Sequence, residues 1–423
     1  MKADEKIEKY DVALVGGGLV GAVAALSLSQ FTDRDFKLLL IERPDFASPK
    51  RHEGRAYALS EGSRMLLEML GLWQAIEPHA QPIEEIDITD SELETVFRPV
   101  FLHFEGEIAM GRPGAYIIEH EVLAEPIYDQ LFKAQNIHIH TEGAFSGLET
   151  GIESGLDAAE LLFDDGSETA QALFKADLVI GADGRGSRVR DFAGIKTFTS
   201  DYNQDGIVVT VELRQPHGGK AVQHFLPSGP FAILPLTNDR ASLVWTEARG
   251  VAAEMCALSD DEFIGEVNKR FSPKLGTVAL SGRRGHFPLS LLLARSFIGP
   301  RVVLIGDAAH GVHPLAGQGM NIGFRDVAAL TEILVETRRL GLDIGGDVAL
   351  TKYQTWRRSD GVMSAFAMDG LNRLFTAEAS SLRELRGFGL RLVDRLPPVK
   401  DFFVKEAAGV NGDVPKLMQG LEI

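Results

Sequence analysis

A glycine-rich turn near the N-terminus constrains the fold of this chain more than any other feature. Residues 11–21 run from an apolar strand through a turn into a helix. In this turn Gly16, Gly18 and Gly21 have the dinucleotide-binding spacing: the first permits the tight turn, the second lets backbone approach a pyrophosphate, and the third lets helix and strand pack closely. Glu42 ends the next apolar strand, where a carboxylate can accept hydrogen bonds from a ribose. The segment therefore predicts a βαβ unit that binds an ADP group.

Two later segments extend this prediction. The passage around Asp183 is a second transition from strand to helix, with Gly184 directly after the aspartate. Far along the chain, an apolar strand ends at Gly306-Asp307, and glycines then lead into a helix. Together, in this order, the three segments point to FAD. Because the sequence contains one dinucleotide fingerprint, a nicotinamide donor is expected to bind only transiently.

The composition fits a folded enzyme. The chain has 423 residues, of which 45% are hydrophobic and 24% charged, enough for a large core and two domains. A formal charge of −17 argues against nucleic acid as a partner and leaves little general attraction to anionic lipid. The single cysteine, Cys256, excludes an internal disulfide and fits a reducing compartment. The first nine residues lack the apolar core of a signal peptide, so we expect a cytoplasmic protein.

The order of the elements predicts the fold class. The patterns indicate strand–helix–strand over residues 10–43, helices over 60–70 and 119–134, a hairpin within 157–180 with its turn at Asp165-Gly166, an antiparallel sheet over 204–247, and mostly helix after Gly317.

Nucleotide-binding and sheet-forming segments are thus interleaved. We predict an α/β protein in which a Rossmann-like FAD-binding domain is interleaved with an antiparallel β-sheet substrate domain, followed by C-terminal helices. The predicted ranges are 1–75, 115–195 and 287–345 for the FAD-binding domain, 76–114 and 196–286 for the substrate domain, and 346–423 for the C-terminal helical region.

The three motifs resemble those of flavin-dependent aromatic hydroxylases related to 4-hydroxybenzoate hydroxylase. Further segments resemble the ubiquinone-biosynthesis hydroxylase family, and the resemblance spans residues 10–420. One departure is His120, where that family more often has asparagine. The matching segments are residues 55–60, 70–73, 80–83 with Asp90 downstream, 116–120, 202–204, 225–230 with 234–236, 244–246, and 407–409 with Gly412 and Pro415.

This resemblance implies a role for each motif. It implies that the ADP half of FAD lies on the first glycine turn, and that the ribityl chain and the flavin ring lie against the later segments. The implied FAD contacts are Gly16, Gly18, Gly21 and Glu42 for the ADP half, Arg55 from the segment after the second strand, Asp183 at the border with the nicotinamide, Asp307 for the ribityl hydroxyls, Gly317, Gly319, Met320 and Asn321 along the flavin edge, and Pro314 close to the flavin ring.

The implied activity is FAD-dependent hydroxylation of the aromatic ring of a polyprenylated ubiquinone precursor, through a flavin C4a-hydroperoxide. The implied co-substrates are O2 and a transient reductant, either NAD(P)H or a ferredoxin-type donor. No acid–base side chain is assigned, because the flavin carries the chemistry. Two alternatives stay open: a hydroxylase of a small soluble phenol, and a non-catalytic flavin-bound subunit of a biosynthetic complex.

The substrate pocket is expected between the flavin and the sheet of residues 204–247. His224, Phe225, Phe231 and Trp245 are candidates to line it, and a plain core role is the alternative for each.

No metal site is predicted. His310 and His313 have a spacing that could ligate a metal on a helix, but they lie inside the flavin motif without an acidic or cysteine cluster.

The segment 371–405 carries seven basic and four acidic residues among apolar ones. We hypothesise that it contacts the inner membrane peripherally, or a partner in quinone biosynthesis that carries the prenylated phenolic lipid. The alternative is an ordinary helix packed on the flavin domain.

Overall fold

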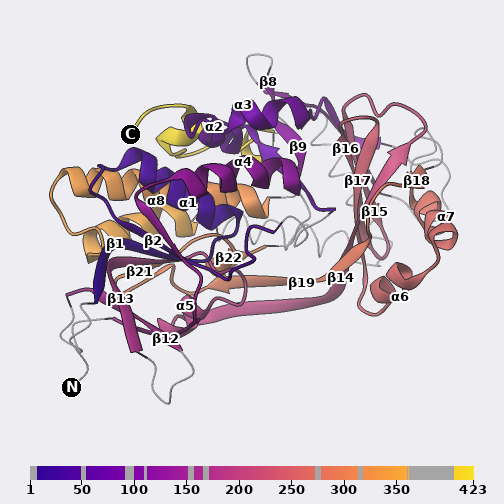
Figure 1. Ribbon diagram of the computed structural model, residues 1–423. Coiled ribbons are helices and arrows are strands. Elements are labelled where there is room, and N and C mark those ends of the chain that lie inside the picture. The colour runs from indigo at the N-terminus through magenta and orange to yellow at the C-terminus, as the bar shows by residue number, and fades with distance from the viewer. Residues whose placement is uncertain are drawn as a thin grey trace.

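The computed structural model describes ten stretches of the chain: residues 7–48, 54–90, 100–108, 112–150, 157–164, 171–271, 278–312, 318–359, 361 and 404–423. Two large sheets dominate it, and they lie at opposite ends of the molecule (Figure 1).

The first is an eight-stranded sheet with the strand order β10-β2-β1-β13-β12-β11, in which β21 also pairs with β13 and β20 with β21. Its central strands are parallel, as expected for a βαβ unit. Helices α1 (Leu19–Phe31), α4 (His120–Lys133) and α8 (Gly319–Arg339) pack together beside it. The strands are β1 (Glu8–Val15), β2 (Leu38–Ile41), β10 (Ile137–His140), β11 (Ala144–Glu149), β12 (Ala159–Asp164), β13 (Gln171–Gly181), β20 (Ile298–Gly299) and β21 (Val302–Leu304).

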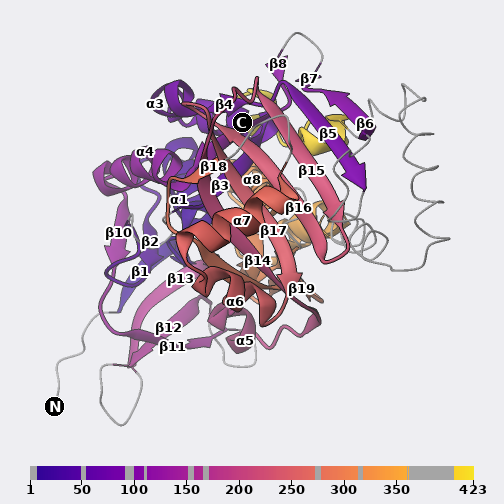
Figure 2. The same ribbon diagram turned by 90° about the vertical axis from the view of Figure 1, so that its right-hand side faces the viewer.

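The second sheet has nine strands in the order β22-β19-β14-β17-β16-β15-β5-β6, with β18 paired to β14. Its strands are antiparallel except at the β15–β5 pair. Helices α6 (Val251–Ala257) and α7 (Asp260–Arg270) cover one face (Figure 2). The strands are β5 (Glu85–Asp90), β6 (Val100–Glu105), β14 (Thr197–Leu213), β15 (Lys220–Leu226), β16 (Gly229–Leu236), β17 (Arg240–Ala248), β18 (Val278–Leu280), β19 (Gly285–Ala294) and β22 (His310–Gly311).

Smaller elements fill the space between the large sheets. A three-stranded sheet joins β3 (Ala56–Ser60), β9 (Ala115–Glu119) and β4 (Gln81–Pro82), and β7 (Glu107–Ile108) pairs with β8 (Arg112–Pro113). The chain end returns to this region, because the short helix η7 (Lys416–Gln419) contacts α2 (Glu61–Met69). The remaining short helices are α3 (Trp73–Ile76), η2 (Glu77–His79), α5 (Arg188–Phe192) and η5 (Gly306–Ala308).

The predicted fold class is confirmed, and so are several local predictions. Helix α2 begins after Ser60, whose hydroxyl accepts the Ser63 N–H, and Gly71 follows it with a φ of +73°. Strands β14 to β17 form the antiparallel block expected over residues 204–247. The turn predicted at residues 165–166 and nearly all of the segment 371–405 lie outside the described residues.

The division into domains stays a prediction. Strands β14 and β19 extend from the flavin-motif side of the molecule into the nine-stranded sheet (Figure 1). Strand β19 crosses the predicted boundary at residue 287, and β22 lies within the range predicted for FAD binding, although both belong to the nine-stranded sheet. No helix in the described stretches is long and apolar enough to span a bilayer.

Candidate functional site

The glycine turn after β1 forms an open cradle at the start of α1. Gly16 has a φ of +108°, and a Cβ there would lie 2.4 Å from the backbone of Ala182. A Cβ on Gly21 would lie 1.9 Å from the carbonyl oxygen of Gly16, so only glycine lets helix and turn meet. A Cβ on Gly18, in contrast, would meet no protein atom within 4 Å. The turn is therefore packed against protein atoms at Gly16 and Gly21 and open at Gly18. A pyrophosphate would lie at this opening, on the helix N-terminus.

Glu42 lies beside this cradle, directly after β2. Its Oε2 accepts the Gly17 N–H at 2.9 Å and its Oε1 accepts the Arg43 N–H at 2.8 Å. These two bonds fix the carboxylate at the carboxyl end of the strand, the edge at which open α/β sheets bind ligands.

Asp183 follows β13 at the same edge. Its Oδ2 accepts the N–H groups of Arg188 and Val189 at 2.7 and 3.2 Å, which holds the start of α5. Its Oδ1 is buried and has no hydrogen-bond partner among the described residues, and burial raises the pKa of the carboxyl. Oδ2 of Asp183 thus has a structural role, whereas Oδ1 could accept a hydrogen bond from a ligand.

Asp307 lies in η5, after β21. Burial raises the pKa of its carboxyl, and the nearby charges of Arg185, His310 and Arg55 act in the opposite direction. The Arg55 guanidinium also lies over the ring of Phe287, 5.4 Å from its centroid. Asp307 therefore brings the third motif close to Arg55 and to the nine-stranded sheet.

The first turn of α8 carries the remaining predicted flavin contacts. Asn321 is buried, and its Oδ1 accepts the Ser60 N–H at 3.0 Å and the Ser63 hydroxyl at 2.9 Å, while its Nδ2 donates to the Ala58 carbonyl at 2.8 Å. The amide thereby ties α8 to β3 and α2. Gly319 and Met320 are partly exposed at the same turn, whereas Pro314 and Gly317 lie outside the described residues.

A buried ionic network that the sequence analysis missed supports the Asp307 turn. Asp326 on α8 is fully buried; its Oδ2 accepts the Gly306 N–H at 3.0 Å and lies 2.6 Å from Nε2 of His310. Its Oδ1 accepts from Nε of Arg357, on the helix of residues 347–359, at 2.8 Å. These contacts hold the pKa of Asp326 below its ordinary value despite burial. The signal available in the sequence was an acid that directly precedes the apolar residues 327–330.

His120, the departure from the family pattern, begins α4. Its Nδ1 lies 3.1 Å from the hydroxyl of Tyr57, whose pKa burial raises to about 12. The imidazole therefore packs against β3, close to Arg55.

Comparison with known proteins identifies the family. The FAD binding domain family matches residues 9–359. The ubiquinone hydroxylase UbiL of Rhodospirillum rubrum is 37% identical, over 98% of this chain and 93% of its own length. The 3-demethoxyubiquinol 3-hydroxylase of Escherichia coli is 32% identical, over 95% of this chain and 98% of its own. This chain belongs to the FAD-dependent ubiquinone-biosynthesis hydroxylase family.

The fold of this hydroxylase agrees with solved structures. The p-nitrophenol 4-monooxygenase of Pseudomonas putida superposes with a TM-score of 0.75 at 19% identity, covering 96% of this chain and 99% of its own. The cradle, the fixed Glu42 carboxylate and the spare acceptor of Asp183 suit FAD.

The hydroxylase carries three of the four predicted pocket residues on the helix-covered face of the nine-stranded sheet. Phe231 and Trp245 are 1% exposed and belong to a core that includes Phe263 of α7, with 5.4 Å between the ring centroids of Trp245 and Phe263. His224 lies opposite Phe231 in the strand register, stacks on it at 6.3 Å and has its Nδ1 2.6 Å from the Thr89 hydroxyl. These three residues pack together beneath α6 and α7.

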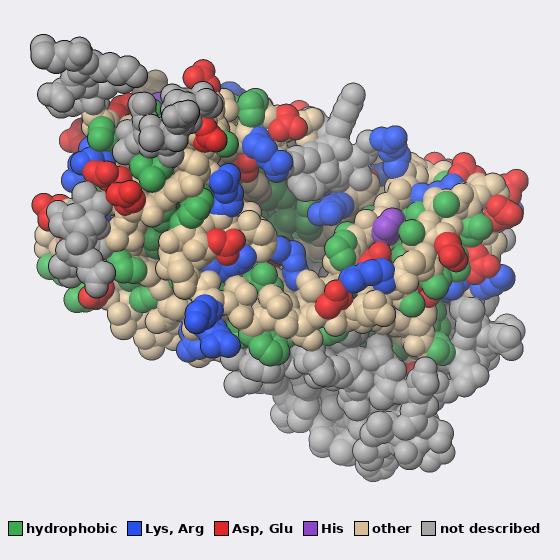
Figure 3. Space-filling model, turned by 90° about the horizontal axis from the view of Figure 1, so that it is seen from below, with side chains coloured by type: hydrophobic (Ala, Val, Ile, Leu, Met, Phe, Trp, Pro, Cys, Tyr) green, Lys and Arg blue, Asp and Glu red, His purple; other side chains and the backbone are tan. Residues whose placement is uncertain are grey.

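The opposite face of the sheet points toward the flavin motifs. Phe287 lies on it, because a Cβ on its register partner Gly206 would meet the Phe287 ring at 2.9 Å, and Arg55 lies over that ring. Further along, Leu234 and Leu236 of this face pack against β9. Phe225 also falls on it by strand alternation. The surface is hollowed near the middle of the molecule, between the parts that carry the two large sheets, with hydrophobic side chains inside and Lys and Arg around it (Figure 3).

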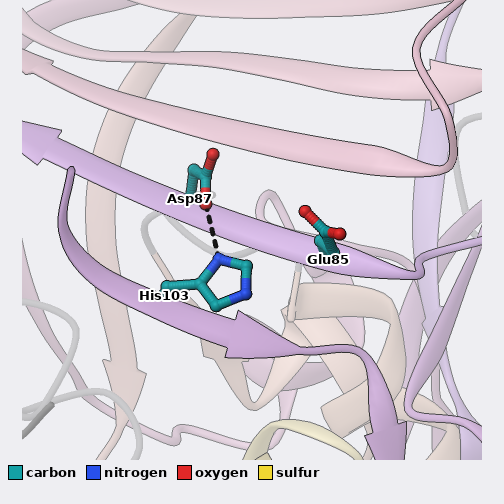
Figure 4. A group of neighbouring side chains, drawn as sticks. All are labelled: Glu85, Asp87 and His103. Carbon is teal, nitrogen blue, oxygen red and sulfur yellow. Dashed lines mark hydrogen bonds and ion pairs between the residues drawn. The ribbon is translucent and has the colours of Figure 1, made fainter.

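One group of potential metal ligands lies at the far edge of this sheet. Glu85, Asp87 and His103 come from β5 and β6 and converge in space (Figure 4). His103 Nδ1 lies 2.7 Å from Asp87, while the ammonium of Lys220 lies 2.6 Å from Glu85 and 3.3 Å from Asp87. Because a cation of the protein already neutralises both carboxylates, the group is an ion-paired cluster that links β15, β5 and β6.

Proposed function

We propose that this protein is an FAD-dependent monooxygenase that hydroxylates the aromatic ring of a polyprenylated ubiquinone precursor. The observation that carries the proposal is the match to the ubiquinone hydroxylase UbiL along nearly the whole chain, with the glycine cradle intact. Hydroxylation consumes O2 and two electrons: one oxygen atom enters the ring and the other leaves as water. We propose NAD(P)H or a ferredoxin-type protein as the electron donor.

In this proposal the residues of the three motifs hold the cofactor. Gly16, Gly18 and Gly21 bind the pyrophosphate, Glu42 the ribose and Asp307 the ribityl chain. Gly319, Met320 and Asn321 border the ring. Gly317 and Pro314 lie outside the described residues, and their contact with the flavin is proposed from the sequence motif alone. Arg55 and Asp183 lie at the entrance to the ring. Bound and reduced, the flavin supplies an electrophilic oxygen atom derived from O2.

The protein itself contributes orientation and exclusion of water. The aromatic ring of the substrate lies on the face of the nine-stranded sheet that carries Phe287, across from Asp307 and Arg55. Apolar side chains on that face exclude water from the reacting atoms and hold the ring in place. We assign no general acid or base, because the flavin carries the chemistry.

Mass spectrometry of quinone lipids tests this function. Cells without the gene should accumulate a prenylated intermediate that lacks one ring oxygen, and the gene should restore the quinone. An unchanged lipid profile, in a strain without a second hydroxylase, would point to a soluble phenol as the substrate. A variant that binds FAD but cannot hydroxylate, and that still restores the quinone, would instead support the scaffold alternative.

We also propose that the protein meets its lipid substrate at the membrane surface or on another quinone-biosynthesis protein. The support is the basic, amphipathic sequence of residues 371–405, nearly all of which lies outside the described residues. Flotation with anionic liposomes tests it: binding should disappear when the basic residues of this segment are replaced, and a chain that never floats would refute it.

A further inference from the structure

The two faces of the nine-stranded sheet are packed differently. On the face beneath α6 and α7, Ile207, Leu243 and Ile233 are at most 1% exposed. On the flavin-facing side, the register partners Val208 and Val244 are only partly buried. These strands lie in the interior of the sheet. If the rest of the protein covered both faces, the side chains on both faces would be buried. The partial exposure therefore marks a hollow along the flavin-facing side, consistent with the surface in Figure 3.

One polar side chain lies within this apolar wall. Gln223 follows Val222, which packs beneath the helices, and so points to the flavin-facing side. Its register partner across β16 is Ala232, and Ala232 pairs in turn with Val244. Gln223 and Val244 are both partly exposed, and they lie on either side of the small Ala232 on this face.

The amide nitrogen of Gln223 has no hydrogen-bond partner among the described residues. This atom, Nε2, is buried. Buried amide donors in native proteins are nearly always satisfied, and leaving one unsatisfied is unfavourable. An acceptor supplied by a ligand in the hollow would satisfy it, whereas a purely hydrocarbon ligand would not.

We propose that Gln223 is a specificity-determining residue whose amide donates a hydrogen bond to a ring oxygen of the phenolic substrate, with Val208 and Val244 packed against the ring. The inference rests on the proposed function and deepens it. It moves the substrate contact from the helix-covered face of the sheet, where His224, Phe231 and Trp245 lie, to the opposite face. The single amide donor in this apolar wall thereby favours binding of the oxygen-bearing ring over binding of the hydrocarbon prenyl tail.

Ligand binding to the FAD-loaded protein tests this proposal. The probes are a short-tailed prenylated methoxyphenol and the same prenylated ring without oxygen, titrated against the absorption spectrum of the oxidised flavin. Gln223→Leu should weaken binding of the phenol about tenfold, the size of one neutral hydrogen bond, and leave binding of the oxygen-free ring unchanged. Gln223→Met, which nearly keeps the length of the side chain but removes the donor, should weaken phenol binding as well and provides the test if the leucine variant does not fold.

Gln130→Leu serves as the matched control. Gln130 is also a partly buried amide, but it lies on α4 and its Nε2 already donates to the Leu70 carbonyl at 3.1 Å. The Gln130→Leu variant should bind both probes with the same affinity as the unsubstituted protein. Equal phenol affinity in Gln223→Leu and the unsubstituted protein would overturn the assignment, and so would equal loss for both probes, which indicates a purely structural role. If the unsubstituted holoenzyme binds neither probe, the proposed substrate class fails together with the assignment.

Discussion

Asp326→Asn is expected to destabilise the protein strongly. Its carboxylate has no solvent exposure and contacts the Gly306 N–H, His310 and Arg357 at 3.0, 2.6 and 2.8 Å. Removing one partner of a buried ion pair costs about 3–5 kcal/mol, because the remaining charge stays desolvated. Since an asparagine oxygen can still accept the Gly306 N–H, we expect the lower end, about 3 kcal/mol.

Thermal unfolding measures this cost. A loss of about 3 kcal/mol corresponds to a fall in Tm of roughly 6–12 °C for a unit of 150–250 residues. Asp343→Asn is the control, because Asp343 pairs with Arg301 at 3.0 Å but is 50% exposed, and exposed ion pairs contribute at most about 1 kcal/mol. Equal Tm values for the two variants would refute the reasoning.

The pH dependence of the same variant gives a second test. The folded-state pKa of Asp326 is lowered, so its contribution is fully present above the unfolded-state pKa and is lost as the pH falls through the folded-state pKa. The Tm difference between the unsubstituted protein and Asp326→Asn should therefore shrink in acid. Measurement on the FAD-free protein separates this effect from cofactor loss, and a difference that grows toward acid pH would contradict the sign.

Three further outcomes follow from the site. Gly18→Ala should leave the Tm of the apoprotein unchanged and weaken FAD binding at least tenfold by fluorescence titration, whereas Gly21→Ala, with its Cβ 1.9 Å from a carbonyl oxygen, should lower both. Because burial raises the pKa of Asp307, Asp307→Asn should stabilise the apoprotein at neutral pH, and that gain should vanish in acid while FAD affinity falls at every pH. Trp245→Leu should lower the Tm and leave the affinity for the prenylated phenol unchanged, since Trp245 packs under α7.

The cofactor cradle could be predicted closely because its signals are local. Three glycines and one acid at fixed spacing specify a turn by steric exclusion, and the structure shows those close approaches at Gly16 and Gly21. Helix α2 was equally predictable, since a serine cap and a terminal glycine lie within its own sequence.

The substrate face could not be predicted in the same way. Strand alternation shows that Trp245 and Val244 point to opposite sides, but not which side faces the flavin. Large aromatic side chains suggested a pocket, whereas α6 and α7, which follow later in the chain, bury them. The Asp326 network was missed for a related reason, because its partners His310 and Arg357 come from separate segments that meet only in the folded protein.

Strand register decides which side chains point to the flavin-facing side, where we propose that the substrate binds. A slip of one residue in β14 would turn its core side chains, Ile207, Val209 and Val211, to the flavin-facing side and Val208 toward α6 and α7. The register of β14 against β19 shifts at an irregularity between Asp201 and Gln204, directly before the block that forms the substrate face.

At this junction Arg185 donates to the Ser290 hydroxyl at 2.7 Å, and Arg55 lies over Phe287. Since both arginines also act on Asp307, the same contacts align the cofactor turn and the sheet face. Continuous strands and the contacts of these two arginines thus set the position of the proposed substrate ring relative to the flavin. Substitutions at this junction should therefore alter the coupling of flavin oxidation to hydroxylation more than they alter FAD affinity. Comparing product formed per O2 consumed with the FAD dissociation constant in Phe287→Leu would decide this, and an unchanged ratio with weakened FAD binding would contradict it.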